Sequence, residues 1–461
     1  MMYQAIIEKL KNKKIAILGF GREGVSTYNF IKKNNIECDL TIIDGNEKLL
    51  DNHDYLLKDN NVNLVLGSNY LDNLAIYDLI IKTPGISLKN CDITLFQDRI
   101  TSQLELILET FKDKCIGITG TKGKSTTTAL IYSIFKDQGY DAYLLGNIGI
   151  PLLDYVHQFT ENSILVIEMS AHQLEFIKTS PKYGIILNLF EEHLDHFGSL
   201  NRYYGSKLNM FKYQQASDYA LYLRDNDTLN NYIENNDYLS NLLALSVKEE
   251  VNTYRDNDYV YIKQGIKIKK VYDLHEERYL LGDHNLIDIM FALTISDLFN
   301  LDNDKTIQTI NGFKGLEHRL ELVGTYDSVI YYNDAIATIP EATINAIKTL
   351  KEVDTLIFGG MDRGINYDSL ITFLAQSNVK NLIAMKDTGY SIGHKIETYG
   401  TNNKLYYVDD LKEAVLLAKK YTKKGKICLL SPAAPSYNAF KNFEEKGKQY
   451  KKLVKEDEED L

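Results

Sequence analysis

One stretch constrains this chain more than any other: the run from Gly117 to Thr126, which reads GITGTKGKST. An apolar segment that begins at Cys115 leads into it and predicts a short buried strand, and a helical pattern through Phe135 follows it. Glycines let the backbone turn its N–H groups toward an anion, and a helix that starts there adds the positive end of its dipole. The order of strand, glycine loop and helix therefore predicts a phosphate-binding loop.

The residues after the glycines indicate which phosphates this loop binds. Lys124 supplies a mobile cation for β- and γ-phosphates, and the Ser125 hydroxyl is a ligand for Mg²⁺. The general motif begins with a glycine where this chain has Ile118, and the glycine here is Gly120 instead. We interpret the loop as an ATP site made of Gly120, Thr121, Lys122, Gly123, Lys124, Ser125, Thr126 and Thr127.

Length and composition limit the remaining possibilities. The 461 residues are enough for roughly two to four domains. A net charge of −11 argues against nucleic acid as the main partner, and no apolar run approaches the ~20 residues that span a bilayer. The N-terminus reads as an amphipathic helix rather than a signal peptide. Four cysteines without metal spacing favour a reducing cytoplasm.

A second glycine-rich turn lies near the N-terminus, where the strand Lys14 to Leu18 runs into Gly19-Phe20-Gly21-Arg22-Glu23-Gly24. A helix follows, then a strand that ends at Asp44, which is the arrangement of a dinucleotide-binding unit. An NAD-dependent oxidoreductase is therefore one reading. The same geometry suits any nucleotide diphosphate, because the helix N-terminus recognises phosphate and not nicotinamide.

Two further strands after the phosphate loop end in chemically active residues. The strand SILVIE ends at Glu168, and a carboxylate at that place in a phosphate-loop domain is the usual second metal ligand. The strand YGIILN is followed by a cluster of candidate ligands: Asn188, Glu191, Glu192, His193, Asp195 and His196. From about Gly315 strands and helices alternate again, which predicts a small doubly wound α/β fold without a phosphate loop of its own.

Nine motifs in order make the chain resemble the Mur ligases, ATP-dependent amide-forming enzymes of peptidoglycan synthesis. They are GITGTKGKST, LGNIGIPL, IEMSAHQLE, LNLFEEHLDHFGSLNRYYGSK, GDHN, GLEHRLE, NDAIAT, GGMDRG and LLSPAAPSYNAFKNFEEKG. The second and the last are typical of the branch that adds glutamate. The resemblance implies three α/β domains: a Rossmann-like UDP-binding domain over residues 1–102, a central ATP-binding domain over 103–315, and a Rossmann-like domain that binds the amino acid over 316–461.

The resemblance also implies a reaction and its participants. ATP phosphorylates the carboxylate of UDP-N-acetylmuramoyl-L-alanine, the amine of D-glutamate attacks the acyl phosphate, and phosphate leaves from a tetrahedral intermediate. ATP and two Mg²⁺ ions are the expected cofactors, and the expected protein is a cytoplasmic monomer. The same ligation with L-glutamate, another Mur ligase and a folylpolyglutamate-type ligase remain open alternatives.

Residue roles follow from the resemblance position by position. Lys124, Glu168, His193 and Lys207 are the expected catalytic residues. Ser125 and Glu168 would hold one Mg²⁺, and His193 with Lys207, if carbamylated, a second. Asn285, Arg319 and Asp334 would contact ATP. The UDP-substrate contacts would be Gly21, Arg22, Glu23, Gly24, Asp44, Asn147 and Gln173, and the amino-acid pocket would contain Thr338, Arg363, Ser436 and Phe443.

Three positions depart from the pattern of the family. Asp288 stands where a second asparagine is frequent, and Arg363 stands where a lysine is usual. Ile336 replaces a lysine of the common motif and so removes a cation near the reacting groups. We expect Arg363 to compensate, because its guanidinium can pair with a carboxylate through two hydrogen bonds.

Overall fold

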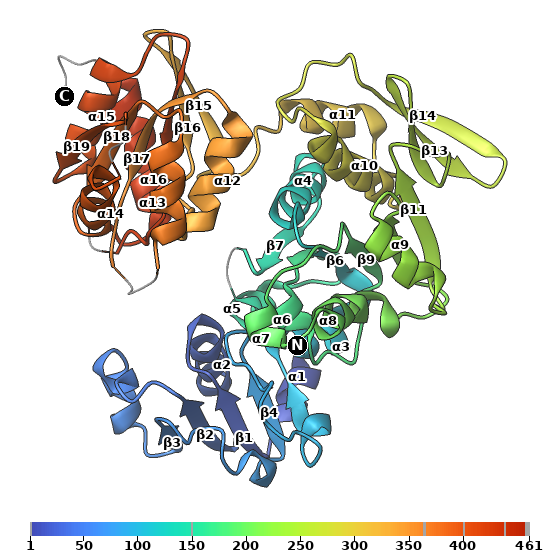
Figure 1. Cartoon of the computed structure of the whole chain (residues 1–461). Coiled ribbons are helices and arrows are strands. Elements are labelled where there is room, and N and C mark those ends of the chain that lie inside the picture. The colour runs from blue at the N-terminus through green and yellow to red at the C-terminus, as the bar shows by residue number, and fades with distance from the viewer. Residues whose placement is uncertain (1, 149–150, 363–365, 400–401, 438, 457–461) are drawn as a thin grey trace. The chain divides into compact units, whose positions relative to one another are not determined.

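The computed structural model describes residues 2–148, 151–362, 366–399, 402–437 and 439–456. The chain separates into two compact units, residues 1–313 and 314–461. In the described residues the first unit holds two β-sheets and the second holds one (Figure 1). No helix among these residues is both long enough and apolar enough to cross a membrane.

The first sheet is five-stranded and parallel, with the strand order β3-β2-β1-β4-β5. Its order reverses between β1 and β4, and open α/β sheets bind ligands at such a point, beyond the carboxyl ends of the strands. The glycine-rich turn after β1 lies at that edge. The elements are α1 (Gln4–Leu10), β1 (Lys14–Leu18), α2 (Arg22–Lys33), β2 (Asp39–Asp44), β3 (Val62–Leu66), β4 (Leu79–Lys82) and β5 (Ile100–Thr101).

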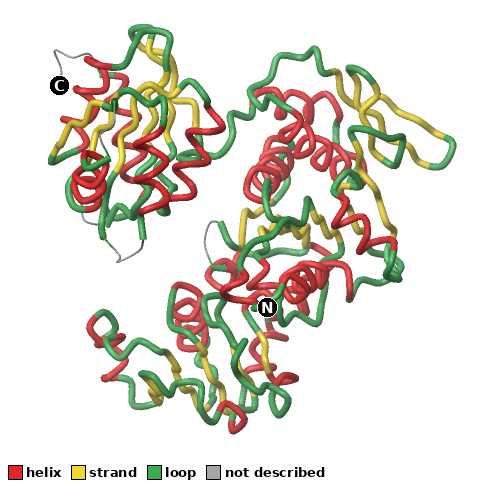
Figure 2. The backbone as a smooth tube through the Cα atoms, in the orientation of Figure 1, coloured by secondary structure: helices red, strands yellow, loops and turns green. Residues whose placement is uncertain are grey.

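The second sheet has nine strands in the order β14-β13-β12-β11-β10-β9-β6-β8-β7. Strands β6 to β12 run parallel, and β13 and β14 form an antiparallel extension that projects at one end of the sheet (Figure 2). Its strands are β6 (Cys115–Thr119), β7 (Ala142–Gly146), β8 (Ile164–Glu168), β9 (Tyr183–Ile186), β10 (Tyr219–Leu223), β11 (Asn241–Ser246), β12 (Thr253–Asp256), β13 (Tyr259–Gln264) and β14 (Lys267–Asp273).

Helices cover both faces of this sheet. Leu130 and Ile134 of α4 share one apolar core with Phe291 of α10, whereas Ile107 of α3 and Phe211 of α8 belong to the core on the other face. That second core continues into the first sheet, which explains why the two sheets form one unit. The helices are α3 (Gln103–Phe111), α4 (Lys124–Asp137), α5 (Leu152–Tyr155), α6 (Ala171–Leu174), α7 (Leu194–Phe197), α8 (Leu200–Lys212), α9 (Asp227–Glu234), α10 (Asp283–Leu298) and α11 (Asn303–Gly312).

The second unit is a six-stranded sheet in the order β15-β16-β20-β17-β18-β19, parallel except for β15. One apolar core packs α15 and α16 on one face, and another packs α12, α13 and α14 on the other. The strands are β15 (Glu321–Tyr326), β16 (Val329–Asn333), β17 (Val353–Phe358), β18 (Asn381–Met385), β19 (Lys404–Val408) and β20 (Ile427–Leu430). The helices are α12 (Pro340–Leu350), α13 (Asp368–Gln376), α14 (Thr388–Glu397), α15 (Leu411–Tyr421) and α16 (Phe443–Lys455).

Candidate functional site

The phosphate loop follows β6, whose five residues are all buried, and leads into α4. Gly120 and Gly123 adopt φ angles of +152° and +86°, which side chains rarely tolerate. A Cβ on Gly120 would lie 2.9 Å from the Leu187 side chain, and one on Gly123 would lie 2.8 Å from Asp288 Oδ1. Both positions therefore require glycine in this fold.

Asn188, just beyond β9, fixes the shape of the loop. Its Oδ1 accepts hydrogen bonds from the backbone N–H groups of Thr121 and Lys122 at 3.0 and 2.9 Å, and its Nδ2 donates to the Lys122 carbonyl at 3.1 Å. Lys122 itself extends outward, and its Nζ lies 2.5 Å from Glu192. The strand-end cluster anticipated from the sequence thus begins with a residue that positions the loop.

Two lysine side chains converge on the loop. Lys124 Nζ donates to the carbonyls of Gly120 and Thr121 at 3.0 Å each, and Lys207 Nζ donates to the Gly120 carbonyl at 2.8 Å. Lys207 is buried, and this burial, together with the positive charge of Lys124, holds its pKa well below the usual value. The Lys124 ammonium thus supplies positive charge at the loop, as transfer of a phosphoryl group requires, and burial favours the neutral amine of Lys207.

Glu168 ends β8 and is 1% exposed. Its Oε1 accepts a hydrogen bond from Asn147 Nδ2 at 2.7 Å, while its Oε2 is buried and has no hydrogen-bond partner among the described residues. A buried carboxylate oxygen without a hydrogen-bond partner suits a hard divalent cation such as Mg²⁺. The Ser125 side chain, also proposed as a Mg²⁺ ligand, is buried at the first turn of α4.

His193 belongs to a group of three histidines. Its ring lies 4.8 Å from that of His172, which lies 4.3 Å from that of His196. Burial, with a smaller effect from the other two histidines, lowers the pKa of His172 to about 3, so its imidazole is neutral. His193 Nε2 lies 3.7 Å from Glu192 Oε2. The sequence pattern does not indicate that His172 belongs to this group.

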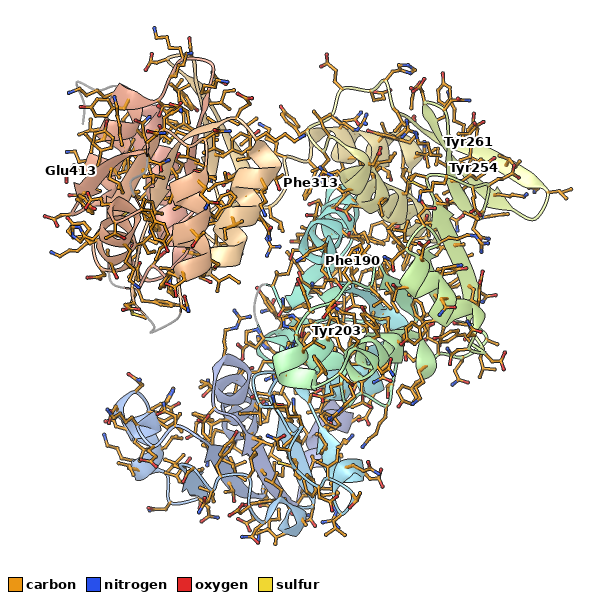
Figure 3. The ribbon with its side chains drawn as sticks, in the orientation of Figure 1. Phe190, Tyr203, Tyr254, Tyr261, Phe313 and Glu413 are labelled. Carbon is orange, nitrogen blue, oxygen red and sulfur yellow. The ribbon has the colours of Figure 1, made fainter. Side chains whose placement is uncertain are left out.

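Tyr203 of α8 is another residue that the sequence did not single out (Figure 3). Its hydroxyl lies 3.3 Å from Thr121 Oγ1, and Lys207 Nζ lies 5.0 Å from the centre of its ring. The same Thr121 hydroxyl accepts a hydrogen bond from the backbone N–H of Phe190 at 3.0 Å. Tyr203 therefore connects the phosphate loop, the segment after β9 and the buried lysine.

Both lysines, two of the histidines and Tyr203 line a cavity of about 330 Å³. It reaches the turn after β4 in the first sheet, so both sheets of the first unit contribute to it. Glu175 ties them together, because its Oε2 lies 3.6 Å from Lys82 Nζ and 3.4 Å from His196 Nε2. The lining residues are Pro84, Gly85, Lys124, Asn147, Ser170, Ala171, His172, Glu192, His193, Tyr203 and Lys207.

The glycine-rich turn of the first sheet lies beside a separate cavity of about 400 Å³ that includes Gly21 and Arg22. Gly24 allows a close approach, since a Cβ there would lie 2.3 Å from the Gly19 carbonyl oxygen. Asp44 accepts hydrogen bonds from the backbone of Phe20 and Asn46 at 2.7 and 2.8 Å, so its carboxylate shapes the turn.

Glu23 and Gln173, both expected to contact the UDP substrate, bond to each other. Gln173 Nε2 donates to Glu23 Oε1 at 2.8 Å, which joins α2 to the start of α6. Burial raises the pKa of the Glu23 carboxyl, and the hydrogen bond from Gln173 partly opposes that rise. Asn147 sits against Glu168, so a residue expected at the UDP sugar is next to an expected metal ligand.

The remaining candidates are divided between the units. Asn285 lies on α10 of the first unit, where its Nδ2 donates to the Leu281 carbonyl at 2.8 Å. In the second unit Arg319 is exposed, and Asp334 is buried and accepts from Ser431 Oγ at 2.8 Å. Burial raises the pKa of Asp334 to about 6. Thr338 and Phe443 are partly buried, Ser436 is buried, and Arg363 lies outside the described residues.

Family models cover all three parts of the chain. Residues 13–102 match the Mur ligase MurD-like N-terminal domain, residues 118–296 the Mur ligase middle domain, and residues 318–434 the Mur ligase glutamate ligase domain. The chain belongs to the Mur ligase family and is an ATP-dependent, amide-forming ligase. Its three-domain α/β architecture is that of the family.

Curated relatives match over the full length. The UDP-N-acetylmuramoylalanine–D-glutamate ligase of Clostridioides difficile is 33% identical over 452 residues, covering 96% of this chain and 99% of that one. The ligase of the same name from Acetivibrio thermocellus is 32% identical over 465 residues, with 97% of each chain covered. A solved UDP-N-acetylmuramate–alanine ligase from Thermotoga maritima shares the fold, with a TM-score of 0.51, 19% identity, and 95% of this chain and 98% of that one covered.

Proposed function

We propose that this chain joins D-glutamate to the alanine carboxylate of UDP-N-acetylmuramoyl-L-alanine at the expense of ATP, in the synthesis of peptidoglycan precursors. The observation that carries the proposal is the 33% identity, over 96% of this chain, to a ligase with that name. The match extends through both units, so the parts needed for nucleotide, UDP substrate and amino acid are all represented. The phosphate loop at the wall of the cavity gives the proposed reaction its site.

The chemistry begins from a carboxylate, which is a poor electrophile. Transfer of the γ-phosphoryl group of ATP to one carboxylate oxygen gives an acyl phosphate and ADP. The amine of glutamate then attacks the acyl carbon and loses a proton, and phosphate leaves from the tetrahedral intermediate. Lys124 would stabilise the charge on the transferring group, because its ammonium already lies at the Gly120 and Thr121 carbonyls.

Metal binding is part of the proposal. Ser125 and Glu168 would hold one Mg²⁺ and His193 a second, and the ions would neutralise phosphate charge during transfer. The buried, unpartnered Oε2 of Glu168 supports the first of these assignments. Tyr203 would keep water out of the site, since it is buried between Thr121 and Lys207.

Lys207 would act as a carbamate. Its burial and the nearby Lys124 favour the neutral amine, which is the form that attacks carbon dioxide. A nitrogen–carbon bond forms as one C=O π bond of carbon dioxide opens, the nitrogen loses a proton, and the neutral amine becomes an anionic carbamate with two oxygens. Such a group would complete the ligands of the second Mg²⁺ together with His193.

The substrates would occupy both units. Gly21, Arg22, Glu23, Gly24, Asp44, Asn147 and Gln173 would contact the UDP substrate, and Asn285, Arg319 and Asp334 would complete the ATP site. Thr338, Arg363, Ser436 and Phe443 would form the amino-acid pocket. The domain ranges 1–102, 103–315 and 316–461, a monomeric state and a cytoplasmic location belong to the same proposal.

A coupled assay of phosphate release tests it. With ATP and Mg²⁺ present, release should require both UDP-N-acetylmuramoyl-L-alanine and D-glutamate. L-Glutamate, aspartate, lysine and diaminopimelate are the comparison substrates. A clear preference for a diamino acid, or release without the UDP substrate, would overturn the assignment, and the product's mass should equal the sum of both substrates less one water.

A further inference from the structure

Among the described residues of the second unit, Lys446 is the most deeply buried lysine or arginine. It lies in the second turn of α16 and is 1% exposed. Its Nζ donates one hydrogen bond, to the Gly359 carbonyl at 2.9 Å, and lies 5.9 Å from the centre of the Phe440 ring. No carboxylate lies within ion-pair distance of it among the described residues. An ammonium can donate three hydrogen bonds, so the Lys446 ammonium can donate further hydrogen bonds.

The acids on the elements packed against α16 bond to other groups and do not compensate the charge of Lys446. Helix α16 packs against β15, β16 and α15. Toward β15, Lys451 Nζ lies 2.7 Å from Glu321 and 3.0 Å from Glu317. His318 Nδ1 and Glu321 Oε2 share the amide of Asn333 at 2.9 and 3.0 Å. On the side of β20, Tyr450 Oη lies 3.6 Å from Cys428 Sγ. Tyr331 of β16 is buried in the same core. On the side of α15, Lys419 donates to the Glu456 carbonyl.

The carbonyl that Lys446 contacts belongs to a tightly built pair of loops. Gly359 follows β17, and the backbone N–H of Gly359 donates to Pro432 O at 2.8 Å, after β20. The Met361 N–H donates to Pro435 O at 2.7 Å, and a Cβ on Gly360 would lie 2.2 Å from that same oxygen. Both loops leave the carboxyl ends of adjacent parallel strands, where α/β folds bind ligands.

Ser436 adds a second donor to the same loops. Its side chain is 2% exposed, and its Oγ has no hydrogen-bond partner among the described residues. The Ser436 carbonyl accepts from the backbone N–H of Phe440, whose ring lies near Lys446. A buried hydroxyl and a buried ammonium, each with unused hydrogen-bonding capacity, thus flank one loop pair.

We propose that Lys446 is a positioning residue whose positive charge, acting through the Gly359 loop, draws a carboxylate of the incoming amino acid to these loops, with Ser436 as a direct donor. This inference rests on the proposed function and deepens it. It also explains how an anionic amino acid can be used although Ile336 stands where a lysine is common. Burial lowers the pKa of Lys446 to about 7, and a bound carboxylate would favour the ammonium form.

Two substitutions separate charge from hydrogen bonding. Lys446→Arg keeps a charge and a donor, whereas Lys446→Gln keeps a donor to Gly359 without charge. We expect the Gln variant to raise the KM for glutamate about tenfold or more, with kcat and the KM for ATP changed less than about twofold, and the Arg variant to restore most of the loss. Lys452→Met is the matched control, since the Lys452 side chain on the same helix is 77% exposed.

Glutamine, used as an alternative substrate, shows which carboxylate of glutamate the charge of Lys446 attracts. If Lys446→Gln raises the KM for glutamate alone, the charge of Lys446 attracts the side-chain carboxylate. If it raises the KM for glutamine equally, the charge attracts the α-carboxylate. A KM for glutamate within twofold of the parent in Lys446→Gln would refute the inference, as would equal recovery by Gln and Arg. If Lys446→Gln does not fold, the KM for glutamate of the parent protein must rise above pH 8, and a flat profile would refute it. Absence of glutamate ligation by the parent protein would instead refute the proposed function.

Discussion

The phosphate loop of the first unit and the paired loops of the second both have lysine ammonium or amine groups bonded to loop carbonyls at the carboxyl ends of parallel strands, but the surroundings of those lysines differ. Lys124 and Lys207 share the Gly120 carbonyl and have Glu168 and Glu192 in their surroundings. Lys446 donates to a single carbonyl and has no carboxylate within ion-pair distance among the described residues. The first arrangement suits a polyanion with its metal ions, and the second suits a single carboxylate.

The largest expected effect breaks the first arrangement. Lys124→Ala should lower kcat by about a hundredfold or more, because removing a donor that stabilises transferring charge costs on the order of 3 kcal/mol. Unfolding temperature should change little, since Lys124 contacts loop carbonyls and not an apolar core. Lys136→Ala, at an exposed position in the last turn of the same helix, is the control. Ligation within tenfold of the parent would contradict the role of Lys124.

Lys207→Ala should have the next largest effect, and chemistry can distinguish its cause. If the carbamate is required, ligation should fall about tenfold or more, and short carboxylic acids added to the assay should restore part of it. Lys212→Ala, at the exposed end of α8, should show neither effect. A folded Lys207→Ala variant that no acid in a series can rescue would leave Lys207 as a simple cation.

Sequence predicted the first site better than the second because the first is contiguous. The phosphate loop, Glu168 at a strand end and the α/β alternation follow from local patterns, and the fold class with three domains is confirmed. The individual site residues and the domain boundaries stay predictions. Tyr203 and His172 were not anticipated, because a buried aromatic ring and a helix histidine resemble ordinary core residues.

The loops of the second unit show why the remainder is hard to predict. Gly359 and Lys446 are separated by 87 positions, so only the pairing of β17 with β20 and the docking of α16 bring them together. Helix α14 has a weak sequence signal, since Gly389 and Gly393 weaken its helical pattern. Both glycines lie in close packing: a Cβ would lie 3.1 Å from the Phe358 carbonyl oxygen at Gly389 and 2.8 Å from the Tyr407 ring at Gly393.

A smaller effect separates binding from stability within the second unit. Ser436→Ala should raise the KM for glutamate about fivefold without lowering the unfolding temperature, because the Ser436 hydroxyl has no protein partner among the described residues to lose. Ser431→Ala should lower the unfolding temperature, since its hydroxyl bonds Asp334 at 2.8 Å and Thr343 at 2.9 Å. Equal effects of the two substitutions on stability would contradict this distinction.

The last prediction is that Asp288 of the first unit and Lys446 of the second contribute to the pH dependence of stability with opposite sign. Asp288 is buried in α10, accepts a hydrogen bond from Thr127 Oγ1 at 2.8 Å, and has its pKa raised to about 7 by burial. Between pH 4 and 7 the folded state therefore holds a proton on Asp288 that the unfolded chain has lost, so the contribution of Asp288 to stability should fall as pH rises. His172 of the same unit, with its pKa lowered to about 3, contributes with the opposite sign between about pH 3 and 6.5. Lys446 has a pKa lowered to about 7, so between pH 7 and 10 the unfolded chain holds the extra proton and stability of the second unit should rise.

One proton of difference gives a slope of at most about 1.4 kcal/mol per pH unit, which denaturant titrations at several pH values can resolve. Relative to the parent protein, Asp288→Asn should change the slope only below about pH 7, because an amide cannot titrate, and Lys446→Met should change it only above about pH 7. The pH range in which Asp288 titrates and the range in which Lys446 titrates meet near pH 7. Lys446→Met is therefore the control below pH 7, and Asp288→Asn is the control above it. If Asp288→Asn changes the slope above pH 8, or Lys446→Met changes it below pH 6, the buried charges of the two units are coupled and do not titrate independently.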